Sequence, residues 1–322
     1  MFEQLIATLK SQPRTIVFTE GPDPRILEAT ARLLKEKLMS VILVGGVDEV
    51  KKAAEAGNFD ISGAEIIDPA AYPQMDAMVE KMVELRKGKM TPEECRTALS
   101  RGNYFGTMLV AMGKADALLG GATYSTADTV RPALQLVKTK PGNKIVSSCF
   151  IMVRQNNENE RYAFGDCAIN ISPNEDELVE IAIETAATAK RFGIDPKVAM
   201  LSFSTMGSGK GEDVDKVRNA TAKAKAAAPQ LALDGELQFD AAFSPVVAQT
   251  KCKGSPVAGQ ANTFIFPEIQ SGNIGYKIAQ RLGGFDAYGP ILQGLNAPIN
   301  DLSRGCNAEE VYTMAIITAG LK

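Results

Sequence analysis

The sequence has 322 residues, of which 45% are hydrophobic and 23% charged, and its formal net charge at pH 7 is −3. This length and apolar content suffice for two packed domains or one large one. The acidic balance, with a pI near 5.4, lacks the basic surface typical of nucleic-acid-binding proteins, so no nucleic-acid partner is expected.

Apolar patterns in the first part of the chain predict alternating strands and helices. Residues 1–12 carry apolar side chains at helical spacing and two charges, a pattern that fits neither a signal peptide nor a membrane-spanning helix. No other segment is long and apolar enough to be predicted as a membrane-spanning helix. Strands are predicted at 15–19, 40–44, 65–67 and 117–119, and helices at 23–38, 47–56, 75–86, 92–101 and 128–137.

The second part of the chain continues this alternation. Strands are predicted at 145–153, 198–204, 263–266 and 288–294, helices at 175–192, 214–228, 274–282 and from Val311, and a hairpin tip at 155–161. Such alternation favours an α/β fold with mostly parallel sheets and helices on both faces.

A turn signal at residues 140–143 places a domain boundary near residue 145. If the C-terminal strand and helix return to the first domain, that domain comprises residues 1–145 plus 295–322, and residues 146–294 form an inserted second domain. Residues 300–310 then lie at an interdomain cleft, a common place for ligand sites.

Residues 300–307 place a hydroxyl, a guanidinium and a thiol within one turn, directly before Glu309 and Glu310. The segment lies between a predicted strand and a predicted helix, which is where α/β proteins place their sites. A guanidinium binds phosphate oxygens in a bidentate manner. An anion site beside a candidate base therefore favours acyl or phosphoryl chemistry.

The sequence contains no histidine, so mechanisms built on a Ser-His-Asp triad, a Cys-His pair or an H-E-x-x-H metal site are excluded. A general base must be a carboxylate, lysine, tyrosine, cysteine or bound water. The five cysteines form no C-x-x-C pair, which predicts reduced thiols in the cytoplasm and no zinc or disulfide framework.

Two nucleotide-binding motifs are absent. Residues 207–210 resemble a phosphate loop, but Ser204 and Gly211 stand where a Walker A motif requires Gly and Ser or Thr. No G-x-G-x-x-G fingerprint follows a predicted strand, so a dinucleotide cofactor is not expected.

Three motifs are similar to those of the phosphate acetyl/butyryltransferase family, and within it to the phosphate acetyltransferases. They are residues 84–87 (ELRK), 121–135 (GATYSTADTVRPALQ) and 298–305 (PINDLSRG), and the similarity extends over nearly the whole chain. The resemblance implies two three-layer α/β domains of the isocitrate/isopropylmalate dehydrogenase-like type, an active site in the cleft between them, and a homodimer.

The resemblance also implies a reaction, the reversible transfer of an acetyl group between acetyl phosphate and coenzyme A, giving acetyl-CoA and inorganic phosphate by direct attack of the thiol. No cofactor takes part in it, because coenzyme A is a substrate, although potassium or ammonium ions often stimulate such enzymes. Two alternatives stay open: a phosphate butyryltransferase-type enzyme, and a non-catalytic acyl-CoA-binding or oligomerisation domain.

The resemblance assigns the catalytic base to an aspartate seven residues after the motif serine Ser303, a position that is Glu310 here. The extra methylene moves the carboxylate, and a misplacement of about 1 Å can cost about 100-fold in rate. Many relatives also have histidine at the position of Tyr124. That histidine is not essential if this protein is active.

The remaining candidates are substrate-binding residues. Arg131 and Arg304 are the first choices for the phosphate, and Arg86 is the third. Ser303 is expected to donate a hydrogen bond to the carbonyl oxygen as it becomes an oxyanion. Ser125 and Thr126 precede a helix start and are expected to offer donors to an anion.

Several of these residues have a structural alternative. Asn307 and Glu310 have the spacing of a helix-capping box. Arg86 fits an ordinary surface charge about equally well. Cys306 is favoured as a small buried residue over a covalent nucleophile, although a thiol near arginine can be activated.

Overall fold

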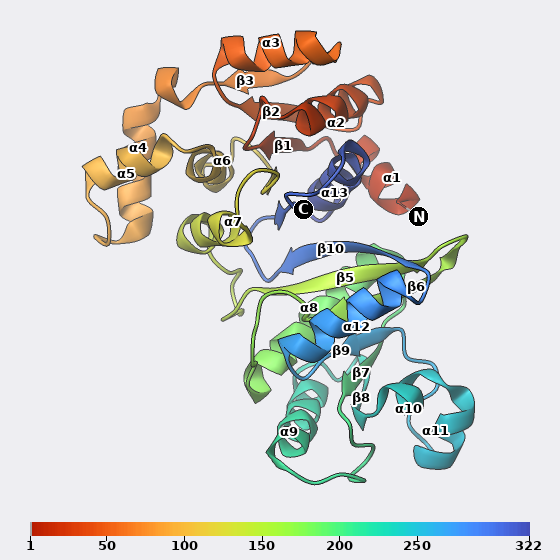
Figure 1. Ribbon diagram of the computed structural model, residues 1–322. Coiled ribbons are helices and arrows are strands. Elements are labelled where there is room, and N and C mark those ends of the chain that lie inside the picture. Colours follow the sequence, from red (N-terminus) through yellow and green to blue (C-terminus); the bar gives the residue numbers. More distant parts are fainter. Residues whose placement is uncertain (1) are drawn as a thin grey trace. The chain divides into compact units, whose positions relative to one another are not determined.

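The computed structural model describes residues 2–322, so that Met1 of the predicted first domain lies outside the described residues. The chain forms two compact units (Figure 1). The first unit comprises residues 2–141 and 295–322, and the second unit comprises residues 142–294.

The first unit is built on a five-stranded sheet with the order β11-β4-β1-β2-β3, in which every neighbouring pair is parallel. Its strands are β1 (Thr15–Phe18), β2 (Ser40–Val44), β3 (Glu65–Ile67), β4 (Ala117–Gly120) and β11 (Ile299–Asp301). β4 is buried throughout, and β1 and β2 are buried after their first residue, as expected for parallel strands covered on both faces.

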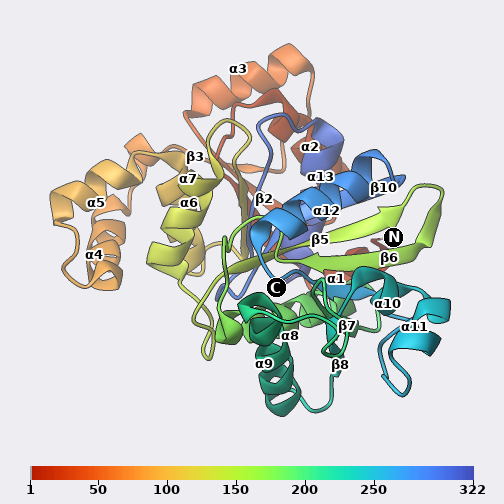
Figure 2. The same ribbon diagram turned by 60° about the horizontal axis from the view of Figure 1, so that its bottom comes forward.

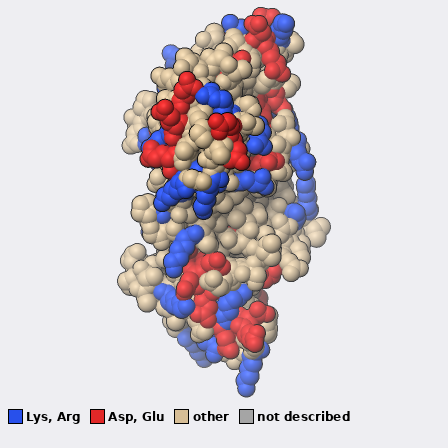
Figure 3. Space-filling model, turned by 90° about the vertical axis from the view of Figure 1, so that its left-hand side faces the viewer, with Lys and Arg blue, Asp and Glu red and all other residues tan. Residues whose placement is uncertain are grey.

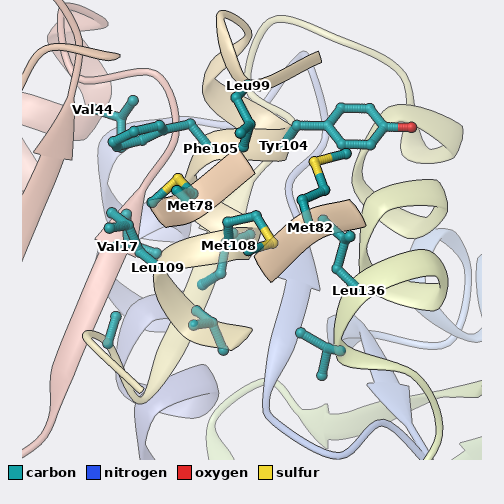
Figure 4. Packing of buried hydrophobic residues seen from close by; sticks show 14 of the residues in the cluster. Val17, Val44, Met78, Met82, Leu99, Tyr104, Phe105, Met108, Leu109 and Leu136 are labelled. Carbon is teal, nitrogen blue, oxygen red and sulfur yellow. The ribbon is translucent and has the colours of Figure 1, made fainter. Parts of the chain in front are cut away.

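Eight α-helices accompany this sheet among the described residues. They are α1 (Glu3–Ser11), α2 (Pro24–Lys35), α3 (Val47–Gly57), α4 (Met75–Arg86), α5 (Pro92–Leu99), α6 (Gly102–Ala111), α7 (Thr126–Pro132) and α13 (Ala308–Gly320). Figure 4 shows how α4 and α6 pack, with Met78 and Met82 of α4 beside Phe105 and Met108 of α6.

The second unit contains a six-stranded sheet with the order β10-β5-β6-β9-β7-β8. Its strands are β5 (Ser147–Arg154), β6 (Asn157–Gly165), β7 (Lys197–Leu201), β8 (Ala232–Leu237), β9 (Thr263–Ile265) and β10 (Phe285–Gln293). Its helices are α8 (Glu175–Arg191), α9 (Glu212–Ala227), α10 (Phe239–Phe243), α11 (Pro245–Lys251) and α12 (Ile269–Arg281). β5 and β6 form a long hairpin (Figures 1 and 2), as predicted, but its turn is shorter than the tip predicted at 155–161: only residues 155–156 form the turn, and residues 157–161 already belong to β6.

The predicted α/β class with mostly parallel sheets is confirmed. All pairs of the first sheet and three pairs of the second are parallel, whereas β10–β5 and β5–β6 are antiparallel. Within the described residues, no helix is long and apolar enough to cross a membrane. Acidic and basic side chains are interspersed on the face shown in Figure 3.

The strand that precedes the motif at 300–307 was assigned wrongly from the sequence. The strand predicted at 288–294 is β10, which belongs to the second unit. The strand that leads into the motif is β11, which pairs with β4 in the first sheet. β11 has only three residues, too few for a period-two pattern to reveal it.

The helix predicted at 128–137 is also different in the structure. α7 begins earlier, at Thr126, and ends at Pro132, after which Ala133–Val137 form a wider π-turn. The cause is Pro132, which has no N–H to donate to the carbonyl of Asp128. Asn103 Nδ2 donates to that carbonyl instead, at 2.8 Å.

Candidate active site

The candidate site lies where three neighbouring parallel strands end. β1 is followed by Thr19 and Glu20, β4 by residues 121–125, and β11 by residues 302–307. From β1 the chain continues to β2 and β3 on one side of β1, and β4 then pairs with the other side of β1. The strand order therefore reverses between β1 and β4. The carboxyl ends of these two strands form a topological switch point, the usual place for ligands in open α/β sheets.

Asp301, the last residue of β11, connects this strand to α7. The residue is 4% exposed, and its carboxylate accepts hydrogen bonds from Thr126 Oγ1 at 2.6 Å and Thr129 Oγ1 at 2.5 Å. Gly121 has a φ of +99°, and a Cβ there would lie 2.2 Å from Asp301 Oδ1. Glycine is therefore required at this close approach, and Asp301 holds the start of α7 to the end of β11.

Burial raises the pKa of the Asp301 carboxyl above its ordinary value near ~3.9. The folded protein therefore binds more protons at Asp301 than the unfolded chain does, so stability is lost as the pH rises above about 4. We expect Asp301→Asn to reduce the fall in unfolding free energy between about pH 4 and pH 7. Urea unfolding of both proteins at several pH values measures this, and equal pH slopes would contradict it.

Glu20 holds the loop that follows β4. Its carboxylate accepts hydrogen bonds from the backbone N–H of Gly121 at 3.1 Å, and from the N–H and Oγ1 of Thr123 at 2.7 and 2.9 Å. Burial raises the pKa of Glu20 despite these bonds. Because Glu20 already occupies these amides, they are not free for a substrate anion in this conformation.

Beside this loop, Thr19 Oγ1 and Tyr124 Oη are 2.6 Å apart. Burial and the nearby charge of Glu20 raise the pKa of Tyr124, so its phenol is neutral at physiological pH. Tyr124 therefore serves as a hydrogen-bonding group inside the loop.

The hydroxyl protons of Ser125 and Thr126 are already engaged. Ser125 Oγ donates to Asp128 Oδ2 at 2.6 Å, and Thr126 Oγ1 donates to Asp301. A hydroxyl has one proton to donate. The predicted role of Ser125 and Thr126 in substrate binding stays a prediction. In this conformation only their backbone N–H groups could donate hydrogen bonds to a substrate.

The loop from Ser303 to Cys306 is exposed except at its last residue. Within it, the backbone N–H of Cys306 donates to the carbonyl of Ser303 at 2.9 Å, and that of Gly305 donates to Ser303 Oγ at 3.2 Å. Among the described residues, the Arg304 guanidinium has no hydrogen-bond or ion-pair partner. It is therefore free to bind an anion.

Cys306 is 6% exposed, and burial raises the pKa of its thiol although Arg25 acts in the opposite direction. A buried thiol with a raised pKa is a poor nucleophile. The structure thus favours the buried-residue interpretation over a covalent acyl-enzyme.

The capping box at the start of α13 is present. Asn307 Oδ1 accepts from the N–H of Glu310, and Glu310 Oε2 accepts from the N–H of Asn307, both at 2.9 Å. The second carboxylate oxygen of Glu310 makes no hydrogen bond to the described residues, and the residue is exposed. Capping therefore leaves one oxygen available for a proton.

The two other candidate arginines lie outside this hydrogen-bonded cluster. Arg131 is exposed in the last turn of α7 and has no side-chain hydrogen bond or ion pair among the described residues. Arg86 ends α4, and its buried Nε has no hydrogen-bond partner among the described residues. Their substrate-binding roles stay predictions.

Sequence reasoning missed two residues of the cluster, Glu20 and Arg25. Glu20 is the second residue after β1, and Arg25 lies in the first turn of α2. Their position after the first strand was a usable signal, because the carboxyl ends of central parallel strands form the ligand-binding edge.

The sequence matches the family described as "Phosphate acetyl/butaryl transferase" over residues 1–319. A phosphate acetyltransferase from Bacillus subtilis (strain 168) is 57% identical over 304 residues, covering 94% of this chain and 93% of the relative. A crystal structure of a phosphotransacetylase from Streptococcus pyogenes has a TM-score of 0.97 at 57% identity, covering 99% of this chain and 97% of that chain.

A putative 4-hydroxythreonine-4-phosphate dehydrogenase from Salmonella typhimurium, 14% identical, has a TM-score of 0.56 and covers 97% of this chain and 100% of its own. At this identity the likeness shows the fold alone, which confirms the dehydrogenase-like class. The match over residues 1–319 and the relatives at 57% identity show that the chain, with its site at the carboxyl ends of β1 and β4, belongs to the phosphate acetyl/butaryl transferase family.

Proposed function

We propose that the protein catalyses the reversible transfer of an acetyl group between acetyl phosphate and coenzyme A. Family membership supports this reaction class, and the relatives with more than half of their residues identical carry the name phosphate acetyltransferase. The observation that carries the proposal is the exposed Arg304 guanidinium beside Ser303, in the loop after β11; this guanidinium has no hydrogen-bond or ion-pair partner among the described residues.

In this proposal Arg304 and Arg131 bind the phosphate of acetyl phosphate. The substrate brings about two negative charges, and a planar guanidinium offers parallel N–H donors that match phosphate oxygens. Neither guanidinium must break an internal ion pair before it binds. Arg86 is the third candidate, suited to a second anionic group such as a phosphate of coenzyme A.

Glu310 takes the proton from the thiol of coenzyme A, and the sulfur attacks the carbonyl carbon of acetyl phosphate. The carbonyl oxygen becomes an oxyanion that accepts a hydrogen bond from Ser303 Oγ. The bond between the carbonyl carbon and the bridging oxygen then breaks. Acetyl-CoA forms, and phosphate leaves and takes up the proton held by Glu310.

The proton transfer is the costly part of this sequence. A thiol titrates near ~8.5 and an ordinary carboxylate near ~4.3, so the transfer is uphill by about 4 pKa units, or about 6 kcal/mol. A cationic group close to the sulfur lowers the pKa of the thiol and reduces this cost. Arg304 can supply such a charge when both substrates are bound.

The acyl specificity and the direct attack can be tested together. We expect acetyl phosphate to react with coenzyme A at least about 10-fold more efficiently than butyryl phosphate. Without coenzyme A, labelled phosphate should not exchange into acetyl phosphate, because no acyl-enzyme forms. A preference for butyryl phosphate would favour the butyryltransferase alternative, and exchange without coenzyme A would indicate an acyl-enzyme.

The proposed steps use no metal ion or organic cofactor, since arginines meet the charge of the substrate. Stimulation by potassium or ammonium is checked by replacing these ions with sodium at constant ionic strength. We also propose a cytoplasmic location, supported by five free cysteines, because disulfides are rare in reducing compartments.

We further propose a homodimer that uses α12. Ile274 and Ile278 of α12 are 57% and 53% exposed, and Leu282, the residue directly after the helix, is 85% exposed. The three lie four residues apart, so they continue one apolar face. Nearby in sequence, β10 is an edge strand of its sheet. A long exposed apolar face of this kind is typical of a protein–protein interface.

We expect Ile278→Glu to shift the protein from dimer to monomer, because a charge in an apolar interface loses its hydration. Light scattering coupled to size exclusion measures the molar mass. The matched control is Val246→Glu, an exposed valine of α11, which should leave the mass unchanged. An unaltered protein that is already monomeric would contradict the proposal.

A further inference from the structure

We propose that Arg25 is a positioning residue that fixes the loop of Ser303 and Arg304 against the loop after β4. This inference rests on the proposed function, because it concerns how that site is held in shape. Arg25 lies in the first turn of α2, far along the chain from both loops.

The guanidinium of Arg25 joins the two loops through their backbone carbonyls. Nη1 donates to the carbonyl oxygens of Arg304 at 2.9 Å and Cys306 at 3.1 Å. Nη2 donates to the carbonyl oxygen of Ala122 at 2.9 Å. One rigid planar group thus sets the distance between the segment after β11 and the segment after β4.

Asp23 fixes the orientation of the guanidinium. Its carboxylate accepts from Arg25 Nε at 3.0 Å and Nη2 at 2.7 Å, and it also caps α2 by accepting from the Arg25 N–H at 2.9 Å. Although burial opposes ionisation, the hydrogen bonds from Arg25 hold the pKa of Asp23 below its usual value. Asp23 is therefore charged at neutral pH.

These contacts use the full donor capacity of Arg25. A guanidinium carries five N–H donors, and five oxygen contacts are present, two to Asp23 and three to backbone carbonyls. No donor is left for a substrate phosphate in this arrangement. Arg25 therefore acts through the loops, whereas the free guanidinium of Arg304 is the one that can bind the anion.

The loop has few other attachments at its centre. Leu302 N–H donates to the carbonyl of Gly120 at 2.7 Å, and Asn307 is fixed by the capping box of α13. Between these points, apart from the bonds that Arg25 donates, the hydrogen bonds of the loop to described residues are internal. The carbonyl of Arg304 is held by Arg25, and its position sets where the Arg304 side chain begins.

The test compares Arg25→Gln and Arg25→Lys with Arg32→Gln. Arg32 is the matched control, because it also lies on α2 and reaches α13, but through the side chain of Glu309 rather than the loop carbonyls. We expect both Arg25 variants to lower kcat by about 100-fold, the cost of a displacement of about 1 Å. The KM values for both substrates should change less than about threefold.

The Arg25→Lys variant is informative because lysine keeps the positive charge and an ion pair with Asp23, which supports folding. Lysine lacks the planar, forked guanidinium that donates to both loops. We expect Arg25→Lys to stay within about threefold of Arg25→Gln. Arg32→Gln should stay within about twofold of the unaltered protein.

Alkylation of Cys306 supplies a readout that does not depend on activity. Its thiol lies 3.7 Å from Arg25 Nη1 and is largely buried. If Arg25 holds the loop, iodoacetamide should label Cys306 at least about 10-fold faster in both Arg25 variants, as followed by peptide mass spectrometry. Cys252, equally buried in the second unit, is the internal control and should react at an unchanged rate.

Unchanged kcat and unchanged Cys306 labelling would overturn the inference. A rise in the KM for acetyl phosphate with kcat retained would also overturn it, because Arg25 would then be a substrate ligand. If the unaltered protein forms no acetyl-CoA, the proposed function fails, while the Cys306 labelling still decides whether Arg25 holds the loop.

Discussion

Replacing Arg304 with alanine should lower kcat/KM for acetyl phosphate by about 1,000-fold. A bidentate, charge-assisted pair of hydrogen bonds to phosphate contributes about 4 kcal/mol, which corresponds to this factor. The unfolding midpoint should stay the same, because the guanidinium is exposed and has no partner among the described residues. Initial rates of acetyl-CoA formation and thermal unfolding measure the two effects.

Two further variants make the Arg304 result specific. Arg304→Lys keeps the charge but loses the planar fork, so its activity should lie between those of the unaltered protein and Arg304→Ala. Arg191→Ala removes an exposed arginine at the end of α8 and should leave the rate within about twofold. Activity of Arg304→Ala within about threefold of the unaltered protein would remove Arg304 from the phosphate site.

Replacing Glu310 with glutamine should lower kcat by about 1,000-fold, within the range measured for general bases. Glutamine keeps the shape of the side chain and still accepts a hydrogen bond from the Asn307 N–H, so the capping box survives. The thermal unfolding midpoint should therefore not change. The substitution separates the two roles of Glu310, because it removes the base and keeps the cap.

The matched control for Glu310 is Glu309→Gln. Glu309 is the neighbouring exposed carboxylate and pairs with Arg32 Nη1 at 2.5 Å. Its loss should leave kcat within about twofold, since exposed ion pairs contribute little. Full activity in Glu310→Gln would assign that residue to the helix cap alone and would require another base.

The sequence predicted most elements of both units because their apolar patterns are regular. The predicted bounds of β2, β3 and α4 agree with the structure, and the capping role of Glu310 followed from its spacing to Asn307. Elements without a clear period were missed. β11 has only three residues, too few to show an alternating pattern. α6 is apolar on nearly all sides and contains two glycines, so it lacks the single apolar face by which a helix is recognised.

The site was predicted less completely than the fold. Ser303 and Arg304 were located correctly in a strand-to-helix loop, because their motif is local. The contacts of Glu20 and Arg25 join residues about 100 and about 280 positions apart, which a local pattern does not reveal. The engagement of the Thr126 hydroxyl by Asp301 likewise depends on tertiary placement.

The most direct test of the account mixes the unaltered protein with coenzyme A and acetyl phosphate, and measures thioester formation and phosphate release together. Binding of coenzyme A is measured in parallel by calorimetry. We expect rapid formation of acetyl-CoA, with one phosphate released for each thioester. Binding of coenzyme A without thioester formation would contradict it and would favour a non-catalytic acyl-CoA-binding domain.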